Sequence, residues 1–554
     1  MATTLTRPAA RPAPERAPRA GRRPDLLALA SLLLAFALRA FRIDAQSFWS
    51  DEGATAYMTG RDIAGILDAA AADIHPPLYY LLTAAWSKAS GTTELALRYP
   101  ALLAGILTVA LTYWIGRRCL GLWPARLGLL FAAVSPLLIY YSQEARMYEQ
   151  MALLGTALVA LAIAWVGPSE RPRSGRLSVW QSVVYVVLLA ALLYTQYLGL
   201  LAVVGANLIV LGRLARAPRR RSAWVIWPAL QAAGGLLFLP WALRVFGQVG
   251  GWPAISEPLD PSRYLREVFR VFTYGLSWDA TVTRAAEVFV VGLLLLGLLW
   301  PLTGRGDRRR RWVGLAIVLT IIVVPVAGLF LISLRRPAYN PKFLLTALPG
   351  FALLLGLGVD TAAAIARGAV RQALLPAGRG SDRARRIAGP AAALVMTAGL
   401  IALYGYFDAR SLRAYYSDPK YQRDDYRGLA ATIAAAEGPG DAIILNAPGQ
   451  AEIFGYYYRG STAVFPLPAD RPPDRAATEA TLGRIAAGHE RVWLVLWATQ
   501  QSDPQAIVEN WLDRHAFKAR SEWFGTVRLV VYTLPSGVAA GVDEPVDAAF
   551  DHGI

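Results

Sequence analysis

The sequence contains a succession of apolar blocks, each about as long as a helix that crosses a lipid bilayer. The hydrocarbon core of a bilayer is about 30 Å thick, and a helix needs about 20 apolar residues to cross it. The blocks recur from residue 25 to residue 406 of a 554-residue chain that is 55% hydrophobic and 17% charged. We therefore predict about eleven transmembrane helices. Their expected ranges are 25–41, 95–116, 123–141, 148–166, 178–194, 197–212, 223–243, 285–302, 312–333, 343–366 and 388–406.

The net charge of +17 is concentrated in every second linker between these blocks, where half of the 56 Lys and Arg residues lie. These basic linkers are the N-terminal segment 7–23 and the segments 117–126, 171–176, 213–221, 305–311 and 367–386. Short cytoplasmic loops of membrane proteins carry such an excess of Lys and Arg. The pattern predicts a multi-pass protein of the cytoplasmic membrane, with a cytoplasmic N-terminus and an extracytoplasmic C-terminal segment. The charge thus reports topology, and it gives no support for a nucleic-acid partner.

The composition divides the chain into four segments. Residues 1–24, rich in Ala, Pro and Arg, are expected to be a disordered cytoplasmic N-terminus, and 541–554 a disordered tail. Residues 25–406 form the predicted all-α polytopic membrane domain, whose first block we interpret as an uncleaved anchor rather than a signal peptide. Residues 407–540 are predicted to be a small extracytoplasmic α/β domain. Its expected strands are 441–445, 463–465, 491–496 and 526–533, and its expected helices are 421–437, 474–487 and 504–515.

The first outer loop, 42–94, holds most of the unusual residues. Asp51 and Glu52 follow the first predicted helix by about ten residues, so they lie at the bilayer boundary. An exposed, solvated acidic pair is one interpretation, but ionised groups at this boundary are costly and usually functional. Further along, His75 is followed by two prolines, which form a rigid non-helical corner. This corner would hold His75, Tyr79 and Tyr80 in fixed positions near Asp51.

Two short outer turns carry further candidates. The turn at 142–147 places Glu144 and Arg146 among the helix ends, where they either function in a site or cap those ends. The turn at 334–342 contains Arg335, Arg336, Tyr339 and Lys342. Three cations in one short outer turn oppose the charge rule for membrane loops. Cations of this kind bind phosphate, whereas anchoring to lipid headgroups is the alternative.

Five motifs taken together resemble the membrane-embedded C-type (GT-C) glycosyltransferases. The resemblance is to the branch with the protein O-mannosyltransferases, the lipid A aminoarabinose transferases and the rhizobial lipopolysaccharide glycosyltransferases. The matching segments are W-S-D-E-G at 49–53, H-P-P-L-Y at 75–79, L-A-L-R-Y-P-A-L-L-A-G at 95–105, S-P-L-L-I-Y-Y-S-Q-E-A-R-M-Y at 135–148 and the turn at 335–342. The likeness covers residues 25–405, and the C-terminal domain matches no family that we can name.

The resemblance implies an inverting transfer of a sugar from a polyprenyl-phosphate donor to an acceptor hydroxyl on the outer face of the membrane. Asp51 matches the general base of the family, with Glu52 assisting or orienting it. Arg335, Arg336, Lys342 and Arg146 are the candidates for binding the donor phosphate. The site would be lined by His75, Tyr79, Tyr80, Glu144 and Tyr339.

The sequence leaves several points open. The acceptor could be a lipid, a glycan or a protein, and the sugar is not determined. No metal ligands stand out, and a divalent metal is not excluded. A polytopic lipid or sugar transporter is the alternative function, although such proteins usually carry ionisable residues at mid-membrane depth in two matching halves. The single cysteine, Cys119, rules out an internal disulfide.

Overall fold

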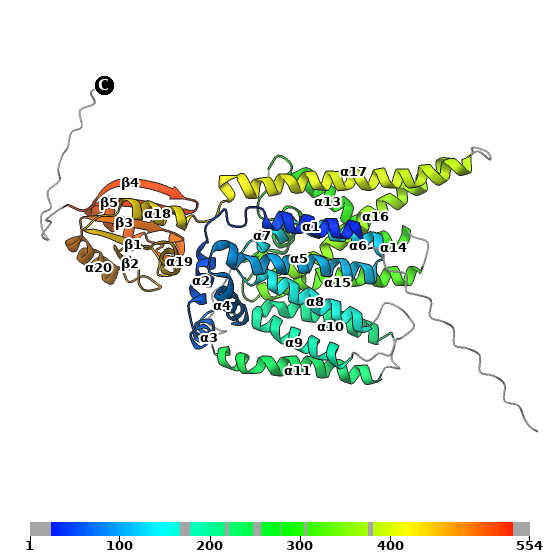
Figure 1. Cartoon of the computed structure of the whole chain (residues 1–554), viewed down its shortest axis with the longest axis horizontal. Helices are drawn as coiled ribbons and strands as arrows, with labels where there is room; N and C mark the ends of the chain where they lie inside the picture. Colours follow the sequence, from blue (N-terminus) through cyan, green and yellow to red (C-terminus); the bar gives the residue numbers. More distant parts are fainter. Residues whose placement is uncertain are drawn as a thin grey trace, which may run out of the picture.

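A computed structural model places a helical domain before a small α/β domain (Figure 1). The structure describes residues 24–535, except for 167–177, 217–220, 248–255, 279, 304–306 and 375–380. The segments expected to be disordered, 1–24 and 541–554, lie outside the described residues apart from Pro24.

The helical domain is built from α1 to α17 and two 3-10 helices. The helices before residue 200 are α1 (Leu26–Ala40), α2 (Ser50–Thr59), α3 (Ile63–Ala72), α4 (Leu78–Ser90), α5 (Glu94–Cys119), α6 (Leu122–Val134), α7 (Pro136–Ser142), α8 (Tyr148–Val166), α9 (Val179–Thr195) and η1 (Tyr197–Gly199). The later ones are α10 (Leu200–Leu214), α11 (Arg221–Val245), α12 (Pro261–Tyr274), α13 (Thr283–Leu298), α14 (Trp300–Thr303), α15 (Arg308–Ser333), η3 (Pro341–Ala347), α16 (Leu348–Ala373) and α17 (Ser381–Ser417). Several of these helices have an N-terminal side-chain cap. Asp25, Asp62 and Thr93 each accept a hydrogen bond from the backbone N–H three residues later.

All eleven apolar blocks are helical, but the number of full spans differs from the prediction. Among the described residues, seven helices are long and apolar enough to cross a membrane, or eight if the bent pair α6 and α7 is one span. Helices α1, α9 and α13 have only 15, 17 and 16 residues. They are shorter than the roughly 20 residues that a bilayer requires. The count of eleven spans is therefore not confirmed.

The predicted span at 123–141 is broken in its middle. Helices α6 and α7 meet at an angle of 54°. Pro136 is the first residue of α7 and follows Ser135, which has a non-helical backbone. A proline lacks the N–H that a continuous helix would need and clashes with the preceding turn. The break turns the chain into the short segment that leads to Gln143 and Arg146.

The α/β domain contains a five-stranded sheet in the order β2-β1-β3-β5-β4. Its elements are α18 (Tyr426–Ala436), β1 (Asp441–Leu445), α19 (Gln450–Tyr457), β2 (Ala463–Pro466), α20 (Arg475–Gly488), β3 (Arg491–Leu496), α21 (Thr499–Ser502), α22 (Ile507–His515), β4 (Phe517–Phe524) and β5 (Val527–Thr533), with the 3-10 turn η4 (Pro419–Tyr421) before them. Strands β2, β1 and β3 are parallel, whereas β5 is antiparallel to both β3 and β4.

The four predicted strands are confirmed, and a fifth, β4, was not predicted. Its sequence FKARSEWF carries four polar residues, and most of its side chains are exposed at the edge of the sheet. Edge strands are protected by charged side chains in this way, which removes the alternating hydrophobic pattern. Helix α19 was missed as well.

The two domains share a hydrophobic core. One cluster joins Phe48, Leu97 and Ala145 of the helical domain to Phe454 and Trp493 of the α/β domain. Gly53 on α2 allows α19 to approach closely, since a Cβ atom there would lie 2.4 Å from the Cβ atom of Ile453. The glycine of the W-S-D-E-G motif is therefore required for the docking of the α/β domain.

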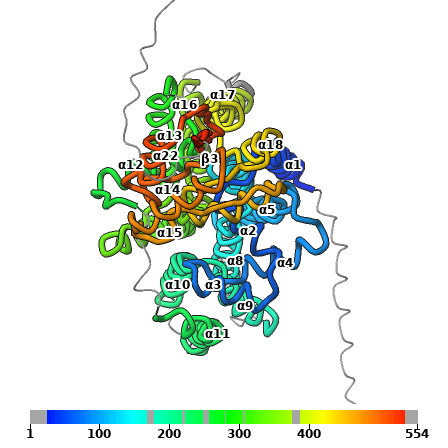
Figure 2. The backbone as a smooth tube through the Cα atoms, turned by 90° about the vertical axis from the view of Figure 1, so that its left-hand side faces the viewer, coloured from blue at the N-terminus to red at the C-terminus, as the bar shows by residue number. Residues whose placement is uncertain are grey.

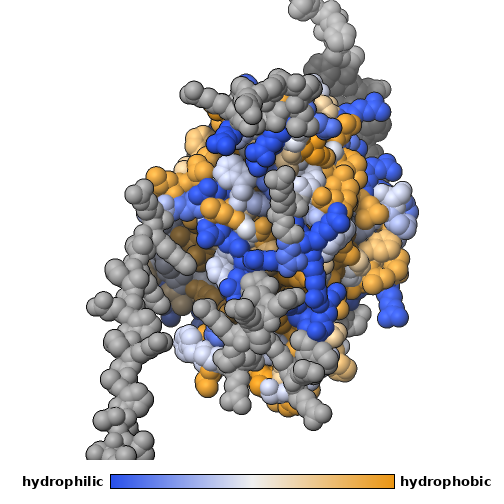
Figure 3. Space-filling view, turned by 90° about the vertical axis from the view of Figure 1, so that its right-hand side faces the viewer, coloured by the Kyte–Doolittle hydropathy of each residue, from blue (hydrophilic) through white to orange (hydrophobic). Residues whose placement is uncertain are grey.

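The α/β domain lies beyond one end of the helical domain, next to α2, α3 and α4 (Figure 1). Viewed from this side, the α/β domain lies in front of part of the helix ends, while α3 and α4 lie beside it (Figure 2). The opposite end shows a gathering of hydrophilic side chains between hydrophobic ones (Figure 3). The first outer loop and the C-terminal domain thus share one end of the molecule, as the alternating linkers predict.

Candidate active site

Asp51 lies at the end of the helical domain that carries the α/β domain. It stands in the first turn of α2, and its side chain is 34% exposed. Its Oδ2 atom lies 3.9 Å from Nε of Arg146 and 3.9 Å from Nζ of Lys342. These distances are too long for hydrogen bonds, so the carboxylate is paired electrostatically and can still accept a proton from a ligand. Of the three cations in the turn at 334–342, Lys342 thus lies next to Asp51.

Arg146 is fixed in place by several contacts. It lies in the turn between α7 and α8, and its side chain is only 3% exposed. Its Nη1 atom donates to the backbone carbonyl of Asp51 at 3.0 Å and to the phenol oxygen of Tyr80 at 3.2 Å. The hydrogen bond to its backbone carbonyl holds Asp51 next to the Arg146 guanidinium. Arg146 is therefore a positioned charge rather than a mobile surface arginine.

His75 lies next to Arg146. Its Nδ1 atom is 2.8 Å from Oδ2 of Asp73, and its Nε2 atom is 3.5 Å from both Nη2 of Arg146 and the hydroxyl of Tyr148. Burial lowers the pKa of His75 below its ordinary value, and Arg146 adds to this effect although Asp73 opposes it. The imidazole is thus mainly neutral at pH 7, and Asp73 orients the ring by accepting from Nδ1–H.

Lys342 approaches Asp51 from the 3-10 helix η3. It is the second residue of η3, and its ammonium lies 4.7 Å from the ring centroid of Tyr148 and 5.7 Å from that of Phe343. Aromatic faces attract a cation at such distances. The side chain of Asn340 accepts a hydrogen bond from the backbone N–H of Lys342 and so begins the 3-10 helix. The proline-rich turn thus aims a single Lys at Asp51.

Glu52 has a different environment from its neighbour. Its carboxylate is fully buried and binds Arg98 through both oxygens, at 2.8 Å to Nε and 2.6 Å to Nη2. It also accepts from the backbone N–H of Ala145 at 2.7 Å. Burial raises the pKa of Glu52, but Arg98 and Arg423 outweigh this effect and hold it below its ordinary value. The geometry favours a positioning role for Glu52, which ties α2 to α5 and to the turn that carries Arg146.

Arg423 brings the C-terminal segment into this network. Its Nη1 atom lies 3.4 Å from Oε2 of Glu52, and its Nη2 atom lies 3.7 Å from Oε2 of Glu144. Burial raises the pKa of Glu144 to about 7, although Arg423 opposes this shift. Near neutral pH, Glu144 therefore neutralises Arg423 only in part.

The remaining predicted site residues are Tyr79, Tyr339, Arg335 and Arg336. Tyr79 is buried and packs edge-on against Tyr80, with 5.7 Å between the ring centroids. Tyr339 packs against Tyr264 at 5.3 Å. Arg335 is exposed, and Arg336 is half-buried. Of the turn at 334–342, Lys342 is thus the residue that the geometry ties to Asp51.

Three residues of the site were not singled out from the sequence. Asp73 orients His75, Arg98 binds Glu52, and Arg423 joins Glu52 to the C-terminal segment. Arg98 is a charged residue inside an apolar block, a signal that could have marked it. Arg423 lies beyond the last predicted transmembrane helix, in the segment 421–437 that was predicted to be helical, where the sequence offers no comparable signal.

Comparison with known proteins identifies the architecture. No protein-family model matches the sequence, and no curated protein sequence matches it. Among solved structures, ArnT from Cupriavidus metallidurans bound to undecaprenyl phosphate aligns with a TM-score of 0.55 at 13% identity, over 93% of this chain and 99% of that chain. The archaeal oligosaccharyltransferase AglB from Archaeoglobus fulgidus, in complex with an inhibitory peptide and a dolichol-phosphate, aligns with a TM-score of 0.51 at 11% identity, over 94% of this chain and 75% of that chain. Both are GT-C glycosyltransferases. The chain has the GT-C fold.

Asp51, Arg146 and Lys342 together are called the Asp51 centre. In this GT-C fold, the Asp51 centre lies where the helix ends meet the α/β domain. Among the residues that the structure describes, no group of three or more His, Cys, Asp or Glu side chains is arranged to hold a metal ion. The charged groups close to Asp51 are instead the cations Arg146 and Lys342. Such a centre can accept a proton and bind an anion at adjacent points.

Proposed function

We propose that this protein is an inverting glycosyltransferase that moves a sugar from a polyprenyl-phosphate donor to an acceptor hydroxyl at the outer face of the cytoplasmic membrane. The observation that carries the proposal is the partly exposed carboxylate of Asp51, held 3.9 Å from two cations at one end of a GT-C fold. A base beside an anion-binding pair is the arrangement that this reaction requires.

The proposed reaction assigns a separate task to each group. The acceptor oxygen attacks the anomeric carbon, and a bond forms between them while its proton passes to Asp51. The bond from the anomeric carbon to the phosphate oxygen breaks, and the electron pair leaves with the polyprenyl phosphate. This leaving group is already a stable anion, so it needs positive charge rather than a general acid. Arg146 and Lys342 supply that charge.

The ligands of the structural neighbours are consistent with a lipid-phosphate donor. ArnT was solved with undecaprenyl phosphate, and AglB was solved with a dolichol-phosphate. Both molecules are long-chain lipids that end in a phosphate. Charge-assisted contacts from Arg and Lys to phosphate are roughly twice as strong as neutral hydrogen bonds. We therefore assign the donor phosphate to the cations at Asp51 and leave the sugar and the acceptor unassigned.

The proposed function is tested by a panel of donors. Purified full-length protein in nanodiscs is incubated with polyprenyl-phosphate sugars that differ in the sugar, together with an extract of envelope acceptors. We expect the release of free polyprenyl phosphate from at least one donor, with the sugar recovered on an acceptor in inverted configuration. Absence of sugar transfer across the whole panel, in protein that unfolds cooperatively, would contradict the proposal.

A neutral residue in place of Lys342 is expected to weaken the donor interaction. In Lys342→Met the side chain keeps its length and loses its charge, so a donor phosphate loses one charge-assisted contact worth about 1.5–3 kcal/mol. The apparent KM for the donor should rise about tenfold or more, because about 1.4 kcal/mol corresponds to a factor of ten. Steady-state kinetics with a responsive donor provide the measurement.

The matched control is Arg310→Met, in the basic segment at the start of α15. This change removes one positive charge from an exposed residue far from Asp51 in the sequence, and the donor KM should stay at the wild-type value. Equal donor KM values for Lys342→Met and the wild type would remove Lys342 from the phosphate site and favour a role in headgroup anchoring.

The proposed orientation follows from the alternating basic linkers and is tested by reporter fusions. A periplasmic alkaline phosphatase fused after residue 406 should be active, because the α/β domain is placed outside the cytoplasm. The same enzyme fused near residue 220 should be inactive. The opposite result at either position would place the Asp51 centre on the cytoplasmic side and overturn the proposed reaction site.

A further inference from the structure

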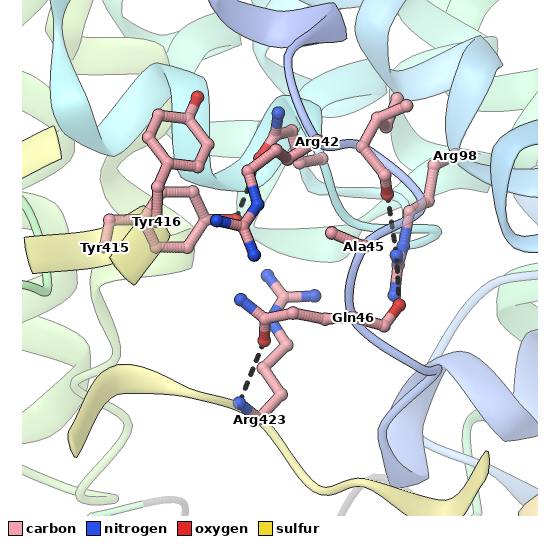
Figure 4. A pocket seen from close by; sticks show the side chains of 9 residues that line it. Arg42, Ala45, Gln46, Arg98, Tyr415, Tyr416 and Arg423 are labelled. Carbon is pink, nitrogen blue, oxygen red and sulfur yellow. Dashed lines mark hydrogen bonds between the residues drawn. The ribbon is translucent and has the colours of Figure 1, made fainter. Parts of the chain in front are cut away.

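A second cationic site is a pocket that adjoins Arg98 and Arg423, the two arginine partners of Glu52. It is narrow and is lined by Arg42, Gln46, Arg98, Tyr415, Tyr416 and Arg423, among others. Arg42, Gln46 and Arg423 also line an adjoining space of about 400 Å³. The residues of the narrow pocket come from the segment after α1, from α5, from the turn after α7, from the end of α17 and from the segment before α18. We call it the Arg42 pocket. Figure 4 shows the side chains of Arg42 and Arg423 pointing toward its middle from two sides, with the side chain of Gln46 next to Arg423.

The two arginines that face the pocket have unused hydrogen-bonding capacity. The side chain of Arg42 makes no hydrogen bond or ion pair with any residue that the structure describes, whereas its backbone carbonyl accepts from the backbone N–H of Ala45. Its φ of 57° is in the left-handed region that non-glycine residues rarely adopt. The side chain of Arg423 is 93% buried, since its exposed fraction is 7%. Its Nε atom nevertheless has no hydrogen-bond partner among the described residues. Leaving a buried charged donor unsatisfied is costly, so a ligand that accepts from it would be stabilised.

The carboxylates around the pocket have protein partners, although Oδ2 of Asp424 and Oε2 of Glu144 accept no hydrogen bond from the described residues. Oε2 of Glu144 lies 3.7 Å from Nη2 of Arg423. Glu52 binds both oxygens to Arg98 and shares one with Arg423. In the adjoining space, Asp424 accepts from the hydroxyl of Thr526, and Asp425 caps α18 by accepting from the backbone N–H of Gly428. The pocket therefore retains an excess of positive charge where Arg42 and Arg423 meet. Two guanidinium groups that face each other are stabilised by an anion between them.

The position of the pocket points to a lipid as the source of that anion. Arg42 follows directly after Phe41, whose side chain is 55% exposed, and α1 exposes Leu33 and Phe36 along its length. Exposed apolar side chains on a membrane helix face the acyl chains, so the end of α1 marks the depth of the headgroups. A phosphate at this depth lies beside Arg42.

We propose that the Arg42 pocket binds the phosphate of an anionic membrane lipid, in a site separate from the cations at Asp51. The forked guanidinium groups of Arg42 and Arg423 suit the geometry of phosphate oxygens. Gln46 already accepts from the backbone N–H of Arg423 through Oε1 at 2.9 Å, so its amide nitrogen is available to donate. Because Arg423 also contacts Glu52, a bound lipid stabilises the network that positions the loop of Asp51.

The proposal is tested by ligand-dependent unfolding of the full-length protein in a non-ionic detergent. Three probes are compared: dihexanoyl phosphatidylglycerol, dihexanoyl phosphatidylcholine and inorganic phosphate. A ligand that binds the folded state raises the unfolding temperature in a concentration-dependent way, which gives an apparent Kd. We expect saturable stabilisation by phosphatidylglycerol and weaker stabilisation by the other two probes.

The decisive variant is Arg42→Gln. Arg42 is exposed and its side chain has no partner among the described residues, so its replacement leaves the fold intact. The apparent Kd for phosphatidylglycerol should rise about tenfold, as expected for the loss of one charge-assisted contact. Arg42→Lys should have an intermediate value because it keeps the charge and loses the fork. Arg413→Gln, an exposed arginine on α17 outside the pocket, should bind as the wild type does.

Each contrary result has one meaning. An unchanged Kd in Arg42→Gln would overturn the assignment of the pocket. Equal, Arg42-dependent stabilisation by inorganic phosphate would show that the pocket takes a free phosphate and would overturn the lipid assignment. Because the readout is binding without turnover, either result leaves the proposed glycosyl transfer untouched. Failure of sugar transfer likewise leaves the pocket assignment standing.

Discussion

Asp51→Asn is expected to reduce turnover by about 10²-fold or more while leaving the fold and donor binding nearly intact. A positioned base contributes about 10² to 10⁴ in rate, and an amide cannot take the proton of the acceptor hydroxyl. The side chain of Asp51 is partly exposed and has no hydrogen bond to another described residue, so an isosteric amide perturbs little of the structure. Turnover number and donor KM are both measured, together with the unfolding temperature.

The matched control for this variant is Asp44→Asn in the same loop. Asp44 is exposed, and among the described residues its contact is one hydrogen bond from Arg427 to its backbone carbonyl, at 3.2 Å. Its replacement should leave turnover within a factor of about two of the wild type, since surface substitutions away from the site have small effects. Wild-type turnover in Asp51→Asn would eliminate Asp51 as the base. A loss of equal size in Asp44→Asn would show that the loop responds to any change of charge.

Glu52→Gln is expected to destabilise the protein by about 3–5 kcal/mol, because it removes one partner of a buried ion pair and leaves the other charged. Arg98 would lose the carboxylate that binds two of its nitrogens, and Arg423 would lose its contact at 3.4 Å. Since these contacts join α2 and α5 to the segment before α18, the α/β domain should loosen at the same time. The unfolding temperature of protein in nanodiscs reports the first effect, and limited proteolysis between residues 418 and 426 reports the second.

A double variant separates the ion pair from simple disruption of the core. Replacing both members, in Glu52→Gln with Arg98→Met, removes one buried charge along with the other and should cost less than Glu52→Gln alone. Glu479→Gln at the exposed pair with Arg475 is the matched control, and it should change stability by less than about 1 kcal/mol. An unfolding temperature for Glu52→Gln equal to that of the wild type would mean that the network does not hold the site together.

The sequence identified the outer loops as the place of the chemistry because the relevant signals are local. Runs of apolar residues, basic linkers and a carboxylate at a helix end can all be recognised within about 20 residues. The presence of a short apolar run likewise predicted β1, β2, β3 and β5. This signal is absent from β4, because most side chains of this polar edge strand are exposed.

The roles of the two adjacent carboxylates could not be distinguished in the sequence. Asp51 and Glu52 are neighbours in α2, yet one is partly exposed beside two cations and the other is fully buried. A helix directs consecutive side chains about 100° apart, so one can face a site while the next faces the core. Which of them is buried depends on the elements that pack against α2.

By itself, the sequence determined the division into a helical and an α/β domain and the end of the molecule at which the candidate residues gather. The tertiary structure decided which residues meet there. Arg98 pairs with Glu52 across 46 positions, and Arg423 reaches the same carboxylate across 371. The physical reason is that burial patterns arise from neighbours along the chain, whereas an ion pair in the core forms only after distant segments have packed together. The Arg42 pocket belongs to this second class, because its walls come from five segments that no local pattern connects.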